Sequence, residues 1–193
     1  IMGEVPVGSA LKRSGAKLAD DIWVSGSLGC AAASLAHLQN ELVIPADELQ
    51  IGLAALHTPQ PRVVLGLALR SIANSCIDIS DGLLADLGHI LEASHLSARL
   101  DLALIPSLDF IHHNFQQPAF QQYLLAGGDD YELCFTAAKS MREKIVQLSQ
   151  TLGLPLSRIG ETSQNATEKQ ADIIVQYQHR TINIAKKGFD HFD

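Results

Sequence analysis

Short strand-like runs alternate with longer amphipathic stretches along most of this chain, and this alternation constrains the fold more than any other feature. Strands are predicted at residues 21–25, 76–80, 98–102, 131–136, 156–161 and 173–177. Helices are predicted at 30–39, from Pro45 to Leu56, and at 62–73, 81–94, 118–125 and 141–152. Some strand pairs are local hairpins, so we expect an α+β domain in which a two-layer mixed β-sheet is covered by helices.

Four further stretches complete this prediction. The helix at 62–73 is apolar on nearly every side, which is typical of a buried helix. Residues 107–117 show no readable period, and residues 163–170 are polar enough to predict a loop. Residues 181–185 are expected to pair with the strand at 173–177 as a hairpin.

Composition excludes several functional classes. The chain has 47% hydrophobic and 18% charged residues, which is enough apolar content for a packed core. Its net charge is −7 and no basic patch stands out, so neither nucleic acid nor an anionic membrane is an expected partner. The three cysteines are far apart and odd in number, which argues against a disulfide framework or a zinc site and favours a reducing cytoplasm.

The stretch CIDISDG carries the strongest functional signal. Asp is disfavoured in strands, yet Asp78 lies between Ile77 and Ile79. Strand periodicity places Asp78 and Ser80 on the face opposite the two isoleucines, and Asp81 follows where a helix begins. Hard cations such as Mg²⁺ prefer oxygen ligands of this kind, and a helix N-terminus favours anions. For Ser80 and Asp81 an ordinary helix N-cap is an equally good interpretation.

Two other stretches could bind charged ligands. In AGGDDYELCF, a glycine pair precedes the adjacent acids Asp129 and Asp130. A bound cation or polar ligand would relieve the repulsion between their carboxylates. A solvated turn explains the same pattern. In LKRSGAK, Arg13 could grip a phosphate, although a solvated basic stretch is the simpler interpretation. Cys134 is expected to be a core residue.

Taken in order, these segments resemble the thiamine-monophosphate kinase family. VPVGSALKRSGAK, DDIWVSGSLG, PRVVLGLALR, CIDISDGLLADLGHILEAS, AGGDDYELCFT, RIGE and GFDHF match the family over nearly the whole chain, and the fourth and fifth of these segments are the most specific. The resemblance implies an enzyme that phosphorylates thiamine monophosphate with ATP, with Mg²⁺ ions bridging the two substrates. It also implies the C-terminal domain of a fold like that of aminoimidazole-ribonucleotide synthetase.

The resemblance assigns roles to the nucleotide-binding and metal-binding positions. Arg13 resembles the arginine that contacts the ATP phosphates, and Ser80 resembles an ATP contact. Asp78 and Asp81 resemble Mg²⁺ ligands. No residue is assigned a covalent catalytic role.

The acceptor side is assigned in the same way. Asp129 resembles the contact to thiamine phosphate, and Phe189 resembles the aromatic residue that packs on the thiamine heterocycle. Asp130 and Glu132 match further positions of the same motif, to which the resemblance assigns no specific contact. Cys30 departs from the family, which commonly has Asp there as a helix cap.

The resemblance also divides the chain. Residues 1–19 are predicted to connect to an N-terminal domain that is missing here, and residues 20–193 to form the C-terminal ATP- and substrate-binding domain. The first residue is Ile1 rather than Met, which agrees with a missing upstream part. We therefore expect the chain to be inactive alone, and a homodimer only for the intact protein. A superfamily enzyme with another phosphate acceptor and a non-catalytic binding module are the alternatives.

Overall fold

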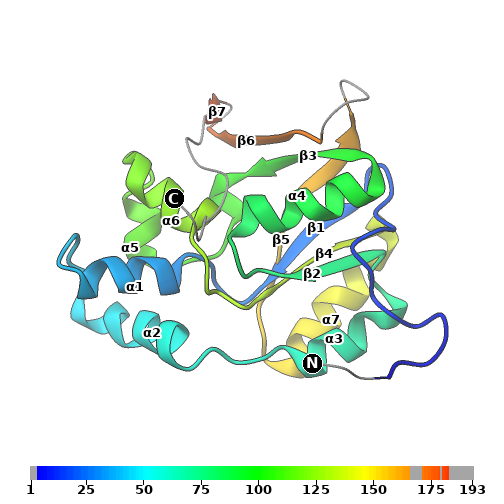
Figure 1. Ribbon diagram of the computed structural model, residues 1–193, viewed down its shortest axis with the longest axis horizontal. Coiled ribbons are helices and arrows are strands. Elements are labelled where there is room, and N and C mark those ends of the chain that lie inside the picture. The colour runs from blue at the N-terminus through cyan, green and yellow to red at the C-terminus, as the bar shows by residue number, and fades with distance from the viewer. Residues whose placement is uncertain (1–3, 166–170, 179, 183–193) are drawn as a thin grey trace.

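The strand predicted at residues 21–25 lies inside the sheet, with a paired strand on each side, and all of its residues are buried. The computed structural model describes residues 4–165, 171–178 and 180–182. Its strands are β1 (Asp21–Ser25), β2 (Ser75–Asp78), β3 (Leu96–Asp101), β4 (Leu133–Ala137), β5 (Leu156–Gln164), β6 (Ile173–Tyr177) and β7 (Arg180–Ile182). They form one sheet in the order β2-β4-β1-β5-β3-β6-β7 (Figure 1). Only the β3–β6 pair among these strands is parallel, which confirms the predicted mixed sheet.

Helices connect and cover these strands. They are α1 (Cys30–Leu38), α2 (Ala46–His57), α3 (Val63–Ala68), α4 (Leu83–Ser94), α5 (Asp109–His113), α6 (Pro118–Ala126) and α7 (Arg142–Leu152), with short 3₁₀ turns at Leu69–Ser71, Leu102–Leu104 and Lys139–Met141. Pro118 begins α6, where its missing N–H costs no hydrogen bond, and Gly153 ends α7 in a left-handed conformation. Within the described part of the chain, no helix is long and apolar enough to cross a bilayer.

The sheet has hydrophobic packing on both faces around β1. Ile22 and Val24 face the larger core, to which α1, α4 and α6 contribute. Trp23 points the other way and stacks on Phe135, with 6.3 Å between ring centroids, in a smaller core with residues of α3 and α7. Figure 1 shows α4 across one face of the sheet and α3 with α7 beyond the other. The predicted α+β class with a helix-covered mixed sheet is confirmed.

The predicted burial of the helix at 62–73 is wrong. Only one side of α3 packs: Leu65 is buried with Leu69, four residues later, while Val63, Val64 and Leu67 are 63%, 65% and 52% exposed. The two buried leucines fall at helical spacing and fill the small core, so the other apolar side chains have no room in it.

Smaller differences concern boundaries. The strand predicted at 131–136 begins at Leu133, and the strand predicted at 76–80 ends at Asp78. The loop predicted at 163–170 is wrong at its start, because β5 continues to Gln164 by pairing with β3. The hairpin between 173–177 and 181–185 is confirmed for its described part, because β7 pairs antiparallel with β6.

The described part of the lead-in, residues 4–19, contains no helix or strand. Its second half is nevertheless bonded to the domain. The Lys12 carbonyl accepts a 2.9 Å hydrogen bond from the Cys76 N–H, and the Gly15 and Ala16 N–H groups donate to the Ser94 hydroxyl. These bonds place Arg13 on the surface beside the end of α4, exposed to solvent.

Candidate functional site

Two acidic loops that are far apart in sequence lie side by side. Beyond the end of β2, the Ile79 N–H donates to the Glu132 carbonyl at 2.8 Å, and the Tyr131 N–H donates back to the Ile79 carbonyl at 2.8 Å. The Asp129 N–H then donates to the Ser80 carbonyl at 3.0 Å. These backbone bonds extend the β2–β4 pairing past both strand ends and bring the segment that contains Asp81 against the one that contains Asp129.

Glycines make this close approach possible. A Cβ on Gly128 would lie 2.7 Å from the Ser80 carbonyl oxygen. Gly82 has φ +111, and a Cβ there would lie 2.8 Å from the Ala126 backbone. Gly128, the second glycine of the pair before the two acids, and Gly82 are therefore needed for close contact between the two segments.

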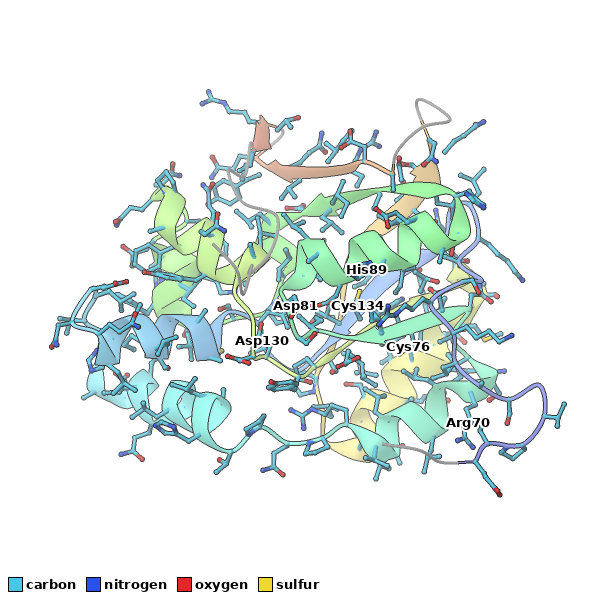
Figure 2. All side chains as sticks on the ribbon, viewed as in Figure 1. Arg70, Cys76, Asp81, His89, Asp130 and Cys134 are labelled. Atoms are coloured by element: carbon cyan, nitrogen blue, oxygen red, sulfur yellow. The ribbon has the colours of Figure 1, made fainter. Side chains whose placement is uncertain are left out.

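The alternation predicted for CIDISDG is confirmed. Ile77 and Ile79 are 6% and 0% exposed in the large core, whereas Asp78 is exposed and Ser80 is half-buried. Asp81 is also half-buried and lies just before Gly82, the N-cap of α4 (Figure 2). Burial of the isoleucines therefore forces the polar side chains outward.

The helix-cap interpretation of Ser80 and Asp81 is wrong. The N-cap of α4 is Gly82, and no side chain caps it. Instead, the Asp86 carboxylate accepts hydrogen bonds from the Ser80 N–H at 2.9 Å and the Asp81 N–H at 3.0 Å. These two N–H groups are thus already occupied, and an anion would have to bind through other donors. Burial raises the pKa of Asp86, and the two hydrogen bonds oppose that shift.

Asp86 is a site residue that sequence reasoning missed. Its only signal in the sequence is an acid in the first turn of α4, a common place for acids because of the helix dipole. By accepting hydrogen bonds from the Ser80 and Asp81 N–H groups, the Asp86 carboxylate holds this turn in place.

Asp129 and Asp130 point in different directions. Asp129 is exposed, with φ +67, and Tyr131 donates a 3.0 Å hydrogen bond to its carboxylate. Asp130 is buried, and its Oδ2 accepts the Gly29 N–H at 2.8 Å, next to the first residue of α1. Its Oδ1 has no hydrogen-bond partner. The solvated-turn interpretation is therefore wrong for Asp130, which binds the loop to the start of α1 (Figure 2).

Asp130 also compensates for the departure at Cys30. The N-cap of α1, Gly29, has no side-chain cap of its own, and Cys30 is buried. The carboxylate that meets this helix N-terminus comes from Asp130, from the opposite loop. Burial, the largest cause, raises the pKa of Asp130 to about 8.

This raised pKa predicts a stability that depends on pH. Between the ordinary value of 3.8 and about 8, the unfolded chain has lost the Asp130 proton while the folded chain keeps it, so this group's contribution to stability falls as the pH rises. Asp130→Asn keeps an acceptor for the Gly29 N–H and cannot ionise. We expect the variant to be more stable than the wild type by about 1–3 kcal/mol at high pH, in line with the cost of a buried unsatisfied group.

Urea unfolding at about pH 5 and about pH 8 measures this difference, which should grow with pH. Asp129→Asn, at the exposed neighbour, is the matched control and should show little pH-dependent gain. An equal effect of Asp130→Asn at both pH values would contradict the prediction.

Glu132 is a structural residue. It is 6% exposed, and its carboxylate accepts two hydrogen bonds from Arg62, at 2.7 Å from Nε and 2.5 Å from Nη2. The Ser25 hydroxyl donates to the same carboxylate. Glu132 thereby connects the beginning of α3 to β1. Arg62 was predicted only as part of a helix, and nothing local in the sequence indicates this pairing.

Two of the cavities beside the joined loops are lined by Asp78, Asp81 or Asp129. The first, of about 350 Å³, lies between α1 and α6; Ala32, Leu35 and Tyr123 line its walls, and Asp81 and Asp129 are among the polar residues that line it. The second, of about 330 Å³, is lined by Pro59, Pro61, Arg62, Asp78, Tyr131 and Leu133. Volumes of this size suit small-molecule ligands. Ser80 and Tyr131 also line the first cavity.

The described residues supply only part of a metal site. No group of three or more His, Cys, Asp or Glu side chains within them is arranged to hold a metal ion. Mg²⁺ commonly uses one or two carboxylates and completes its shell with phosphates and water, so Asp78 and Asp81 suit a partial ligand set. Arg13 is not among the residues that line these cavities, and Phe189 lies outside the described residues.

Comparison with known proteins identifies the family of this chain. Residues 20–170 match the family described as AIR synthase related protein, C-terminal domain. The chain belongs to this family. Over its full 193 residues this AIR synthase related domain is 42% identical to thiamine-monophosphate kinase of Escherichia coli K12, and over 197 aligned residues it is 29% identical to that of Bacillus subtilis 168. It spans 58% of the length of each. The resemblance predicted from the motifs is therefore confirmed.

This AIR synthase related domain is also similar to solved structures. Thiamine-monophosphate kinase from Stenotrophomonas maltophilia K279a is 40% identical, with a TM-score of 0.78 over 92% of this chain and 56% of that one. AaThiL complexed with AMPPCP and TMP is 25% identical, with a TM-score of 0.72 over 94% of this chain and 54% of that one. Hydrogenase maturation protein HypE, at 17% identity and a TM-score of 0.66, shares the fold.

Proposed function

We propose that this chain is the C-terminal part of a kinase that transfers the γ-phosphoryl group of ATP to thiamine monophosphate, giving thiamine diphosphate. The observation that carries the proposal is the junction of the two loops, where Asp78, Asp81 and Asp129 line cavities of ligand size. The similarity to thiamine-monophosphate kinases along the whole chain supports the choice of substrate.

The roles follow from placement. Asp78 and Asp81 would hold Mg²⁺, which when bound neutralises the charge of the phosphates. Ser80 lies between them and would contact ATP, while Arg13, on the lead-in, would reach the ATP phosphates from outside the cavities. Asp129, on the facing loop, would contact thiamine monophosphate. Phosphoryl transfer depends on positioning and charge neutralisation, and the rigid backbone pairing of the loops supplies positioning.

The relatives are longer than this chain, which spans 58% of the Escherichia coli enzyme. We propose that the remaining part supplies further phosphate and metal contacts, and that this chain alone does not turn over substrate. Homodimer formation is likewise proposed only for the protein at the full length of its relatives, as is its cytoplasmic location.

The deciding experiment measures ATP-dependent formation of thiamine diphosphate by the protein at that full length, with Mg²⁺ present. Thiamine monophosphate should be phosphorylated, and aminoimidazole ribonucleotide precursors or free thiamine should not. Phosphorylation of another acceptor while thiamine monophosphate is left unchanged would overturn the proposal and favour a different enzyme of the same superfamily.

Phe189→Ala tests the acceptor side. If its ring packs on the thiamine heterocycle, its loss should raise KM for thiamine monophosphate by about tenfold, comparable to one base-sized stacking contact, and leave KM for ATP unchanged. Steady-state kinetics with each substrate varied in turn measures both. Phe192→Ala, in the same GFDHF segment, is the matched control. Equal weakening of both substrates by Phe189→Ala would contradict its assigned role.

A further inference from the structure

The conformation of Tyr131 has no explanation in core packing. Its side chain is 42% exposed, yet its backbone has φ +50, in the left-handed region that bulky residues rarely adopt. Asp129, two residues earlier, is also left-handed, with φ +67. Such conformations cost about 1–3 kcal/mol each and persist where the surroundings fix them.

The surroundings fix this loop from three sides. The Tyr131 N–H is bonded to the Ile79 carbonyl and the Asp129 N–H to the Ser80 carbonyl. Between them, Asp130 is buried and bonded to the Gly29 N–H. With its central residue directed inward, the loop turns Asp129 and Tyr131 outward on the same side.

The Tyr131 side chain lies where the two cavities meet. It lines the first cavity together with Asp81 and Asp129, and the second together with Asp78 and Arg62. Its hydroxyl donates to Asp129 Oδ1 at 3.0 Å. The nearby carboxylates Asp129, Asp78 and Asp81 all raise the pKa of this phenol, so the ring stands among the acids of the site.

We propose that Tyr131 is a positioning residue for Asp129: its hydroxyl occupies one carboxylate oxygen and directs the other into the first cavity, which Asp129 and Tyr131 line together. The inference rests on the proposed function, because it takes Asp129 as the contact to thiamine monophosphate. A carboxylate held by a hydrogen bond loses less freedom when a ligand binds, so affinity rises without a new contact to the ligand.

The test is a double-mutant cycle between Tyr131→Phe and Asp129→Ala, which removes the acceptor of the Tyr131 hydroxyl, in the protein at the full length of its relatives. Binding of thiamine monophosphate is measured by titration calorimetry, and KM and kcat by thiamine diphosphate formation. Tyr131→Phe keeps the ring and loses one hydrogen bond to a charged group, so we expect affinity for thiamine monophosphate to fall about tenfold. KM for ATP should be unchanged. In the Asp129→Ala background, where the hydroxyl has no acceptor left on this side chain, the same substitution should have little further effect.

Tyr177→Phe, on β6 and outside both cavities, is the matched control and should bind like the wild type. The inference is overturned if Tyr131→Phe binds normally, if it only lowers the melting temperature, or if its effect is equally large in the Asp129→Ala background. A wild-type protein that binds no thiamine monophosphate would instead overturn the proposed function.

Discussion

Asp78→Asn, in the protein at the full length of its relatives, should lower kcat for thiamine diphosphate formation by on the order of 10²-fold, comparable to the loss of one preorganised electrostatic group. The substitution keeps the shape of the side chain and removes its charge. Because a carboxylate that holds Mg²⁺ against the transferring phosphate acts mainly in the transition state, the loss should appear in kcat. Asp78 is exposed, so the melting temperature should change little.

Asp101→Asn is the matched control, because Asp101 is also the exposed last residue of a strand. Its carboxylate accepts only a local bond from the Ala103 N–H, which an amide oxygen can still accept. Both proteins should therefore melt alike, and only Asp78→Asn should lose turnover. If Asp78→Asn keeps the wild-type kcat, Asp78 is not a metal ligand, even though the family assignment would still hold.

Arg62→Met should cause the largest loss of stability among single changes near the site, about 3 kcal/mol, because it leaves the buried Glu132 carboxylate without its cation. The Ser25 hydroxyl remains as one partner, and Arg62 is itself 24% exposed, so the loss should lie near the lower end of the range for broken buried pairs. Urea unfolding of this chain measures it.

Two further proteins sharpen this test. Arg70→Met removes an exposed arginine from the turn after α3 and should cost little. Adding Glu132→Gln to Arg62→Met removes the stranded charge and should restore most of the lost stability. If Arg62→Met and Arg70→Met unfold at the same urea concentration, the Arg62–Glu132 pair does not hold α3 to the sheet.

Local periodicity was enough to predict much of the fold. Ile77 and Ile79 identify the buried face of one strand, and thereby the outward direction of Asp78. Pro118 correctly marks the beginning of α6. These features depend on neighbours in sequence. The buried face follows from the two-residue period of a strand, and the helix start follows from a single proline.

Other features depend on partners that are distant in sequence. The burial of Asp130 depends on the Gly29 N–H, and the role of Glu132 on Arg62, and neither partner can be found from a local pattern. The one-sided burial of α3 depends on how little space remains around Phe135 in the small core. The roles of Arg13 and Phe189 stay predictions from the resemblance.

The place of β1 in the sheet also affects how the chain can be made. β1 comes early in the sequence, yet its two neighbours, β4 and β5, begin only at Leu133 and Leu156. At ordinary translation rates of about 5–20 residues per second, β1 waits on the order of ten seconds for its first partner. During synthesis this apolar strand has both edges unpaired, which favours binding by a chaperone or aggregation. A ribosome that stalls between α4 and β4 would therefore release a fragment in which β1, buried along its whole length in the folded chain, cannot be covered.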